Sequence, residues 1–217
     1  MKSYGQYCAV AKALDVVGDR WTLLIVRELA TQGPSRYTDL RAGLPGIASN
    51  LLATRLRELE AAGLITRTAA PPPIATTLFE LTDRGRALKD VLYALGRWGV
   101  DLMASPDGSE AFRSSWFTFA AENFLSDTDP TAPDVTIALD AGDAPVYLAV
   151  GGGHVELRPG AAPSPDLTLT GEPRLIMGVL AGKLPLEAAR SAGLSVTGDP
   201  AILTRAGRPQ PSPASTS

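Results

Sequence analysis

The sequence contains one cysteine, Cys8, and one histidine, His154, among its 217 residues. A single cysteine excludes an intrachain disulfide and any metal site built from several thiolates. His154 would need partner ligands to bind a metal, or a nucleophile and an orienting group to act as a base, and none is recognisable in the sequence. We therefore expect a structural or surface histidine, no metal, no cofactor and no catalytic residues, so the protein is not expected to be an enzyme.

Long apolar runs are also absent. No segment approaches the roughly 20 consecutive apolar residues that span a bilayer. Lys12, Asp15 and Asp19 interrupt the first apolar stretch, unlike the core of a signal peptide. Hydrophobic residues make up 45% of the chain, which is typical of a globular protein. These features predict a soluble cytoplasmic protein with no membrane partner.

Acidic residues are in slight excess, and the two halves of the chain have net charges of opposite sign. Residues 1–104 contain 13 Lys and Arg against 10 Asp and Glu, whereas residues 105–217 contain 7 against 13. A mildly basic first half is compatible with a polyanionic partner, and an acidic second half disfavours nucleic acid there.

The first half reads as helices followed by a hairpin and a last helix. Apolar residues recur at helical spacing in residues 7–18, and residues 19–31 are apolar enough to form a central buried helix. A short helix is expected over residues 36–44. A strand pair at 64–68 and 77–82 encloses a proline-rich stretch, and a long helix starts near Thr82.

The helix expected over residues 49–62 has two different sides. At about 100° per residue, its leucines fall on one side, and Asn50, Thr54 and Arg57 fall on the other. Ser49 is a suitable N-cap, because its hydroxyl can accept from the first free amides. The polar side is either a solvated helix face or a surface that contacts DNA.

The order of these elements favours the second interpretation. A short helix, a turn with Gly46 and a second amphipathic helix form a helix-turn-helix, and a hairpin directly after it is the wing of a winged helix. Asn can pair with an adenine edge and Arg with a guanine edge or a phosphate. Arg36, Arg41 and Arg67 are candidate phosphate contacts.

The second half changes character after a linker at residues 104–109. A helix expected over 110–125 places Phe112, Trp116, Phe119 and Ala120 close to one side, and strand-length segments follow at 134–139, 145–150, 154–158 and 166–170. The segments "LTLTGEP" and "LSVTGDP" both end a strand with Thr-Gly and start a helix with an acid and a proline. The three glycines at 151–153 predict a hairpin turn. Residues 207–217 are expected to be disordered.

The apolar side chains of this half have two interpretations. They either form an ordinary core or line a pocket for an apolar ligand. The candidate pocket residues are Trp116, Phe119, Ile176, Met177 and Leu180.

The motifs "DRWTLLIVREL", "RYTDL", "LPGI" and "LRELEAAGL", in this order, resemble the HxlR family of bacterial winged-helix regulators. The resemblance covers about residues 4–103. It implies a homodimer that binds double-stranded DNA, with the first and last helices at the dimer interface. It places Ser49, Asn50, Thr54 and Arg57 on the recognition helix and Arg36 at the start of the preceding one. Many relatives have an arginine in the wing, where this chain has Thr76 and Thr77.

The segment "PDLTLTGEPRLIMGVLAGKLPLEAARSAGLSVTGDPAIL" is similar to the sterol carrier protein type 2 fold. This resemblance implies helices packed on a sheet around an apolar tunnel. The expected fold class is therefore α+β: a winged helix-turn-helix domain for DNA binding and dimerisation at 1–104, and a smaller-sheet α/β domain of sterol-carrier type at 110–206.

The sequence thus predicts a transcriptional regulator, with repression favoured, that binds a palindromic operator as a homodimer and senses an apolar small molecule through its second domain. The alternative is an apolar-ligand carrier whose first domain serves only for dimerisation. Cys8 is either a small buried hydrophobe or a redox sensor, since a helix N-terminus lowers a thiol pKa.

Overall fold

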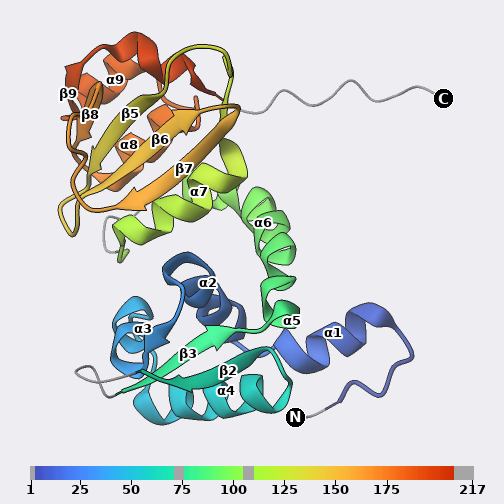
Figure 1. The fold of residues 1–217 in the computed structure, drawn as a ribbon. Helices are drawn as coiled ribbons and strands as arrows, with labels where there is room; N and C mark the ends of the chain where they lie inside the picture. The colour runs from blue at the N-terminus through green and yellow to red at the C-terminus, as the bar shows by residue number, and fades with distance from the viewer. Residues whose placement is uncertain (1–2, 71–75, 105–109, 208–217) are drawn as a thin grey trace. The chain divides into compact units, whose positions relative to one another are not determined.

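The computed structural model describes residues 3–70, 76–104 and 110–207. The chain divides into two compact units, Met1–Ser109 and Glu110–Ser217. In Figure 1 the ribbon is coloured by residue number, from blue in the first unit to red in the second. Each unit has its own sheet, helices and buried core. None of the described helices is long and apolar enough to cross a lipid bilayer.

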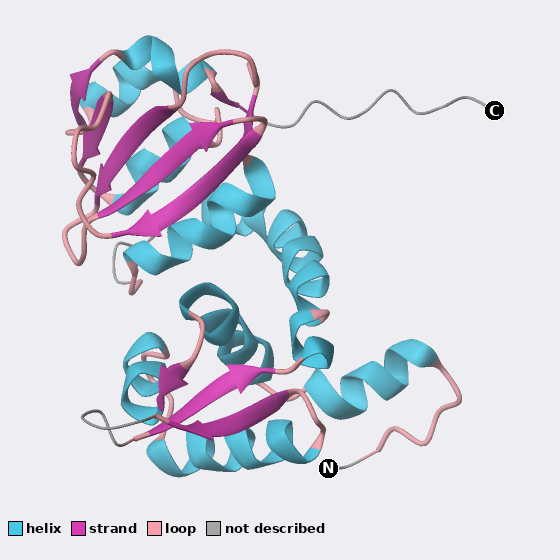
Figure 2. Cartoon of the chain, viewed as in Figure 1, coloured by secondary structure: helices cyan, strands magenta, loops and turns pink. Residues whose placement is uncertain are grey.

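The N-terminal unit is mainly helical, with one small sheet (Figure 2). Its elements in chain order are α1 (Ala9–Val17), α2 (Thr22–Gln32), β1 (Ser35–Arg36), α3 (Tyr37–Gly43), α4 (Ser49–Ala61), β2 (Ile65–Ala69), β3 (Thr77–Leu81), α5 (Asp83–Arg86), α6 (Leu88–Gly99) and the 3₁₀ helix η1 (Val100–Ala104). This is the order predicted for a winged helix-turn-helix.

The sheet of this unit has the strand order β1-β3-β2. β2 and β3 form the predicted antiparallel hairpin, in which Ile65 lies opposite Leu81 and Ala69 opposite Thr77. β1 pairs with β3 through Ser35, which lies opposite Phe79. This strand was not predicted, because two residues are too few to show an alternating pattern.

Aliphatic side chains fill the core of the N-terminal unit. α2 contributes Ile25, Val26 and Leu29, all at most 2% exposed, which confirms the prediction of a central buried helix. α4 contributes its three leucines, described below. Each fully buried side chain of this size stabilises the fold by roughly 1.5–3 kcal/mol.

One prediction at a helix end is wrong: Ala48, not Ser49, is the N-cap of α4, and Ser49 is the first helical residue. The predicted cap at Thr82 is confirmed, because its hydroxyl accepts from the Gly85 amide. The long helix after β3 is divided into α5 and α6 at Ala87, which keeps a right-handed helical backbone conformation. Gly85 packs directly against the Leu64 carbonyl, which holds α5 at the end of the hairpin.

The C-terminal unit contains most of the strands. Its elements are the 3₁₀ helix η2 (Ser114–Trp116), α7 (Phe117–Phe124), β4 (Ser126–Asp127), β5 (Val135–Asp140), β6 (Val146–Gly151), β7 (His154–Pro159), β8 (Leu167–Thr170), α8 (Pro173–Leu180), α9 (Leu186–Ser191), β9 (Ser195–Gly198), the 3₁₀ helix η3 (Pro200–Thr204) and β10 (Ala206–Gly207). All four strands predicted between residues 134 and 170 are confirmed.

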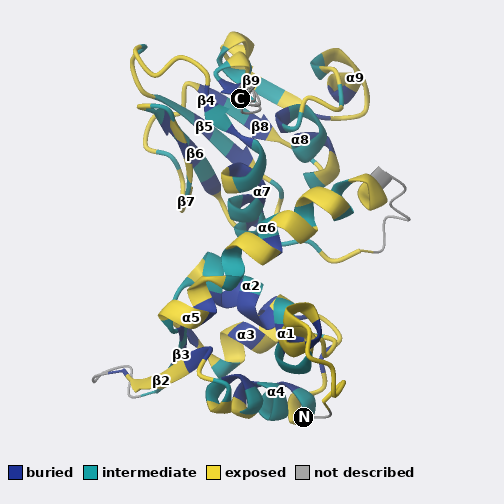
Figure 3. Cartoon of the chain, turned by 90° about the vertical axis from the view of Figure 1, so that its right-hand side faces the viewer, coloured by how far each residue is buried: buried dark blue, intermediate teal, exposed yellow. Residues whose placement is uncertain are grey.

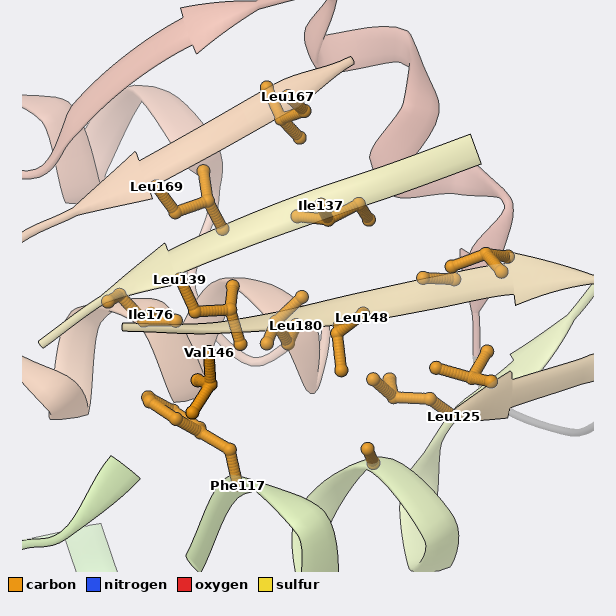
Figure 4. Packing of buried hydrophobic residues seen from close by; sticks show 14 of the residues in the cluster. Phe117, Leu125, Ile137, Leu139, Val146, Leu148, Leu167, Leu169, Ile176 and Leu180 are labelled. Carbon is orange, nitrogen blue, oxygen red and sulfur yellow. The ribbon is translucent and has the colours of Figure 1, made fainter. Parts of the chain in front are cut away.

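The main sheet of this unit has the order β7-β6-β5-β8-β9, in which β5 and β8 are parallel and the other pairs antiparallel. The helices cover one face of it (Figures 2 and 3). Alternate residues of the strands, among them Ile137, Leu139 and Leu148, point to that face and pack with α7 and α8 (Figure 4). The core of this unit therefore lies between one face of the sheet and the helices.

α7, which the sequence predicted over residues 110–125, starts later and buries different residues than expected. The α-helix starts only at Phe117, and its buried positions are Phe117, Ala120 and Ala121. The amide and hydroxyl of the buried Ser114 donate to the Asp143 carboxylate in the loop between β5 and β6. This attachment fixes the segment before Phe117 in a 3₁₀ turn, which sequence periodicity does not reveal.

The predicted turns are present. Gly152 and Gly153 both have positive φ, of 58° and 85°, and form the hairpin turn between β6, which ends at Gly151, and β7. Pro173 and Pro200 each occupy the first turn of a helix after a β-strand. The repeated Thr-Gly-acid-Pro pattern therefore marks two strand-to-helix turns, as expected.

A buried ion pair connects the end of this unit to its start. Arg205 donates to the Asp127 carboxylate from Nη2 at 3.0 Å, and the backbone amides of Asp129 and Gly153 donate to the same carboxylate. Burial raises the pKa of the Asp127 carboxyl, but these amides and the guanidinium more than offset that effect, so the pKa lies below its usual value.

We predict that Asp127→Asn lowers the free energy of unfolding of this unit by about 3 kcal/mol at neutral pH, because it leaves Arg205 without its counter-charge. A lowered folded-state pKa means that the stabilisation is complete above the unfolded-state pKa of about 3.9 and is lost as the pH falls through the folded-state pKa. Amide hydrogen exchange in β5 and β6 measures the effect.

Glu110→Gln, at an exposed position of the same unit outside the network around Asp127, serves as the control and should exchange like the unaltered protein. If Asp127→Asn and the control exchanged equally fast at every pH, the ion pair would not contribute to stability.

Candidate nucleic-acid interface

α3 and α4 form the helix-turn-helix, and residues 44–48 connect them. Leu44 and Ile47 of the connection are buried, and Gly46 between them has φ +87°, which a glycine adopts without strain. The Tyr37 hydroxyl donates to the Ser49 carbonyl oxygen at 2.7 Å. The first turn of α4 is thereby attached to the first turn of α3.

α4 buries one side and exposes the other (Figure 3). Leu52, Leu56 and Leu59 are 0–2% exposed and lie in the core of the unit. Ser49, Asn50 and Arg57 are exposed, and Thr54 is half-buried. The polar side predicted from the sequence therefore lies outside the core of its own unit.

Among the described residues, the side chains of Asn50, Thr54 and Arg57 form hydrogen bonds only with groups of α4 itself. The Asn50 Oδ1 accepts from the Leu51 amide at 2.9 Å, and the Arg57 Nη2 donates to the Thr54 Oγ1 at 3.1 Å. Asn50 retains its amide donors and Arg57 most of its guanidinium donors for an external partner. These two side chains can reach base edges or phosphates.

The other charges of α4 are paired. Arg55 bridges Asp19 and Glu58 at 2.5 Å each, which attaches α4 to the segment before α2. Glu60 pairs with Arg67 on β2 at 2.6 Å. The carboxylates of Glu58 and Glu60 are both neutralised beside the polar side of α4.

The three arginines considered as phosphate contacts differ in their surroundings. Arg36 is exposed at the N-cap of α3, and Arg41 is exposed near its end. Neither side chain forms an ion pair with any described residue. Arg67 is engaged with Glu60 and also lies 5.5 Å from the centre of the Phe79 ring. Arg36 and Arg41 are therefore better placed than Arg67 to bind a phosphate.

The wing is described only at its base. Thr77 starts β3 and is exposed, whereas Thr76 is half-buried and accepts from the Ala70 amide at 2.8 Å. The proline-rich stretch 71–75, which contains no cation, lies outside the described residues.

A buried carboxylate lies under α3 and was not anticipated from the sequence. Glu28 of α2 is 0% exposed, and it accepts from Arg27 at 2.7 Å and from Gln32 at 2.5 Å. It also lies directly against Gly43 of α3, where a methyl group would overlap the carboxylate. The packing of α3 on α2 thus depends on a glycine at position 43.

Cys8 is exposed at the N-cap of α1, so its interpretation as a buried hydrophobe is wrong. The backbone amides of Ala11 and Val10 point at the sulfur and lower the pKa of the thiol. An exposed thiol of lowered pKa is chemically suited to oxidation or alkylation.

Exposed hydrophobic side chains are concentrated on the N-terminal unit. Trp98 of α6 is 72% exposed, and Leu102 and Met103 of η1 are 74% and 64% exposed. Val10 and Leu14 of α1 are also exposed, as are Val91 and Leu95 of α6. Within α6 and η1 these side chains recur on consecutive turns, and exposed apolar residues grouped in this way are typical of protein contact surfaces.

The apolar cavity of the C-terminal unit is very small. It lies between α7, α8 and the sheet and has a volume of about 10 Å³, which is room for a single water molecule. Met177 and Leu180 line it, Ile176 is fully buried elsewhere in the core, and Trp116 and Phe119 do not line it. Among the described residues, no group of three or more His, Cys, Asp or Glu could hold a metal ion.

Known proteins resemble the N-terminal part of the chain. The model of the HxlR-like helix-turn-helix family matches residues 16–106. YvaP of Bacillus subtilis, an uncharacterized HTH-type transcriptional regulator, is 34% identical over 90 residues, which are 42% of this chain and 82% of that protein. Rv3095 of Mycobacterium tuberculosis, another uncharacterized HTH-type transcriptional regulator, is 38% identical over 100 residues, 46% of this chain and 62% of its own length.

Solved structures of regulators resemble the same part of the chain. The reduced form of the transcriptional regulator YodB from B. subtilis has 28% sequence identity and a TM-score of 0.40, covering 47% of this chain and all of that one. The family match ends at residue 106, so the C-terminal unit falls outside it.

We predict that Cys8 reacts with iodoacetamide faster at pH 7 than an ordinary cysteine in an unfolded peptide. Because the thiol pKa is lowered, the reactive thiolate persists to lower pH, and the midpoint of the rate against pH should fall below about 8.5. The same chain unfolded in urea is the control. Equal midpoints for the folded and unfolded chains would show that the helix N-terminus does not activate the thiol.

Proposed function

Because the chain belongs to the HxlR-like helix-turn-helix family of transcriptional regulators, we propose that it reads operator DNA with the outer side of α4. Asn50 and Arg57 contact base edges in the major groove, which is wide enough for an α-helix. Ser49 and Thr54 complete this surface, and Arg36 and Arg41 bind phosphates. Arg67, Thr76 and Thr77 belong to the wing and contribute less.

The observation that carries this proposal is the two-sided burial of α4. Its leucines occupy the core, and the side with Asn50 and Arg57 is exposed. The carboxylates nearest to that side are paired with Arg55 and Arg67, so they do not repel a phosphate backbone strongly.

We further propose that the regulator is a homodimer, and α1, α6 and η1 supply the interface. The exposed Trp98, Leu102 and Met103 would be costly to leave in water, and a second copy of the chain covers them. A dimer of this kind presents two copies of α4 to successive half-sites about 34–36 Å apart, so the operator is palindromic. Binding there blocks transcription, which makes the protein a repressor.

The C-terminal unit is proposed to be a sterol-carrier-like module that receives an apolar effector. Its five-stranded sheet with helices on one face supports this resemblance. Because its cavity holds about 10 Å³, an apolar ligand would enter only if α7 moved away from α8 and the sheet. A carrier role for the whole chain is less well supported, since a carrier needs a preformed cavity for its ligand. In this proposal, oxidation of the Cys8 thiol is a second signal that regulates the protein.

We predict that Arg57→Ala weakens operator binding about tenfold to a hundredfold, because a base or phosphate contact of Arg contributes about 1–3 kcal/mol. The operator is first obtained by selection from random DNA, which should enrich a palindrome. Fluorescence anisotropy at several salt concentrations then measures the affinity, and the salt slope should fall by about 1 if Arg57 binds a phosphate.

Arg190→Ala is the matched control, because Arg190 is an exposed arginine paired with Glu187 in the C-terminal unit. It should bind the operator like the unaltered protein. Selection that enriched no sequence, or equal losses for Arg57→Ala and Arg190→Ala, would contradict the proposed DNA contact.

We predict that Trp98→Glu raises the dimer dissociation constant about 100-fold, as expected when a hot-spot tryptophan is replaced by a charge. Sedimentation equilibrium measures the effect, and circular dichroism should be unchanged because the side chain is exposed. Ala188→Glu, at an exposed position of α9, is the control. A dimer unaffected by Trp98→Glu would place the interface elsewhere.

A further inference from the structure

The segment that joins α1 to α2 contains an unusual backbone conformation. Trp21, the residue before α2, has φ +83°, and it is the only non-glycine residue with a positive φ in the part of the chain that the structure describes. A bulky residue adopts this conformation at an energetic cost, and it persists only where the surrounding structure holds it, often at a functional site. The contacts of this segment therefore indicate its role.

The segment is attached to the helix-turn-helix at two points. The indole ring of Trp21 is half-buried, and it lies 3.8 Å from the position that a β-carbon on Gly46 would occupy, in the connection between α3 and α4. Asp19 pairs with Arg55 of α4 at 2.5 Å. Because these contacts are made by the residues on either side of Arg20, Arg20 lies beside the helix-turn-helix although it precedes it in the sequence.

Arg20 is exposed and oriented, and it has no charged partner. Its guanidinium carbon lies 5.8 Å from the centre of the Trp21 ring, within the roughly 6 Å over which a cation–π interaction acts. It forms no hydrogen bond or ion pair with any described residue, and the carboxylate of its neighbour Asp19 is taken by Arg55. An arginine stacked on a ring loses less conformational freedom on binding and keeps its N–H donors, which suit a phosphate.

Arg20 lies on the side of α4 away from the wing. At about 100° per residue, Arg55 and Glu60 fall on opposite flanks of the outer side of α4. Glu60 pairs with Arg67 of the wing strand β2, whereas Arg55 pairs with Asp19. The outer side of α4 is therefore bordered by the wing on one flank and by the segment with Arg20 on the other.

We propose that Arg20 binds a phosphate of the operator on the border of the major groove opposite to the wing. The two borders of a major groove are the backbones of different strands, so a helix in the groove has phosphates on both flanks. The wing flank offers little free positive charge, because Arg67 is engaged by Glu60 and residues 71–75 include no cation. Arg20 thus holds the other strand from outside the helix-turn-helix. This contact rests on the proposed function, the binding of operator DNA by α4.

A contact of this kind has a characteristic effect on binding. Phosphates are the same in every sequence, so a phosphate contact adds affinity and fixes the position of the protein without selecting bases. Arg20 should therefore contribute equally to operator DNA and to unrelated DNA, in contrast to Asn50 and Arg57.

The test compares Arg20→Gln with the unaltered full chain on the selected operator and on an unrelated duplex of equal length. Fluorescence anisotropy is measured at several salt concentrations. We expect the affinity for both duplexes to fall about tenfold and the salt slope to fall by about 1 for each bound subunit, because one phosphate contact is lost per subunit. Selection from random DNA should enrich the same palindrome. Arg20→Lys keeps the positive charge and should keep the salt slope.

Arg84→Gln is the matched control. Arg84 is an exposed arginine of the same unit, and its guanidinium already donates to the Ala62 carbonyl oxygen at 2.9 Å. The control should bind both duplexes like the unaltered protein, and circular dichroism checks that each variant is folded. The proposed contact is overturned if folded Arg20→Gln binds like Arg84→Gln, or if it enriches a different sequence.

Ethylation interference locates the contact on the DNA. Ethylation removes the charge of a single phosphate, so it should weaken binding of the unaltered protein at a phosphate on the border away from the wing. Arg20→Gln should be insensitive to ethylation at that phosphate, and identical interference patterns for the two proteins would refute the contact.

The outcomes separate this contact from the proposed function. Weaker operator binding by Arg57→Ala, without any loss for Arg20→Gln, would refute the Arg20 contact alone. DNA binding that depends on Arg20 but not on Arg57 would refute base reading by α4 and leave the phosphate contact standing. A chain that binds no DNA would refute both.

Discussion

The burial of three leucines on one side of α4 is the constraint on which the N-terminal unit depends. Leu52, Leu56 and Leu59 lie in the core, so the rotation of the helix about its own axis is fixed by the hydrophobic effect. Arg55 adds a second attachment through Asp19 and Glu58, and Tyr37 adds a third at the first turn. The direction of Asn50 and Arg57 therefore follows from packing on the opposite side, and the surface proposed to meet DNA is a by-product of the core.

The sequence predicted those parts of the fold in which one periodic pattern decides the structure. The leucine spacing of α4, the alternation of β5 and β6 and the Thr-Gly-acid-Pro turns each depend on neighbouring residues alone, and the structure has them all. Interactions between distant segments were not predictable in this way. Ser114 meets Asp143 and stops α7 from starting earlier, and Arg205 meets Asp127 across the whole unit. Nothing in the local pattern around these residues signals a partner.

The same division applies to the candidate site. Asn50, Thr54 and Arg57 were identifiable because helical geometry places them opposite the leucines. The partner of Arg67 was not, because Glu60 reaches it only after the chain has turned into β2. Met177 and Leu180 are apolar at helical spacing, which is typical of a closed core and of a pocket lining alike, so the sequence could not decide between these two roles.

The packing of Glu28 against Gly43 has a consequence for how this sequence can change. Position 43 can gain a methyl group only if the Glu28 carboxylate shifts, since the two would otherwise overlap. Arg27 and Gln32 hold that carboxylate in place, so the shift would disturb both hydrogen bonds. Substitution at either site alone is therefore expected to be costly, and a paired replacement less so. The junction between α2 and α3 is thus expected to vary more slowly among descendants of this chain than its burial alone would suggest.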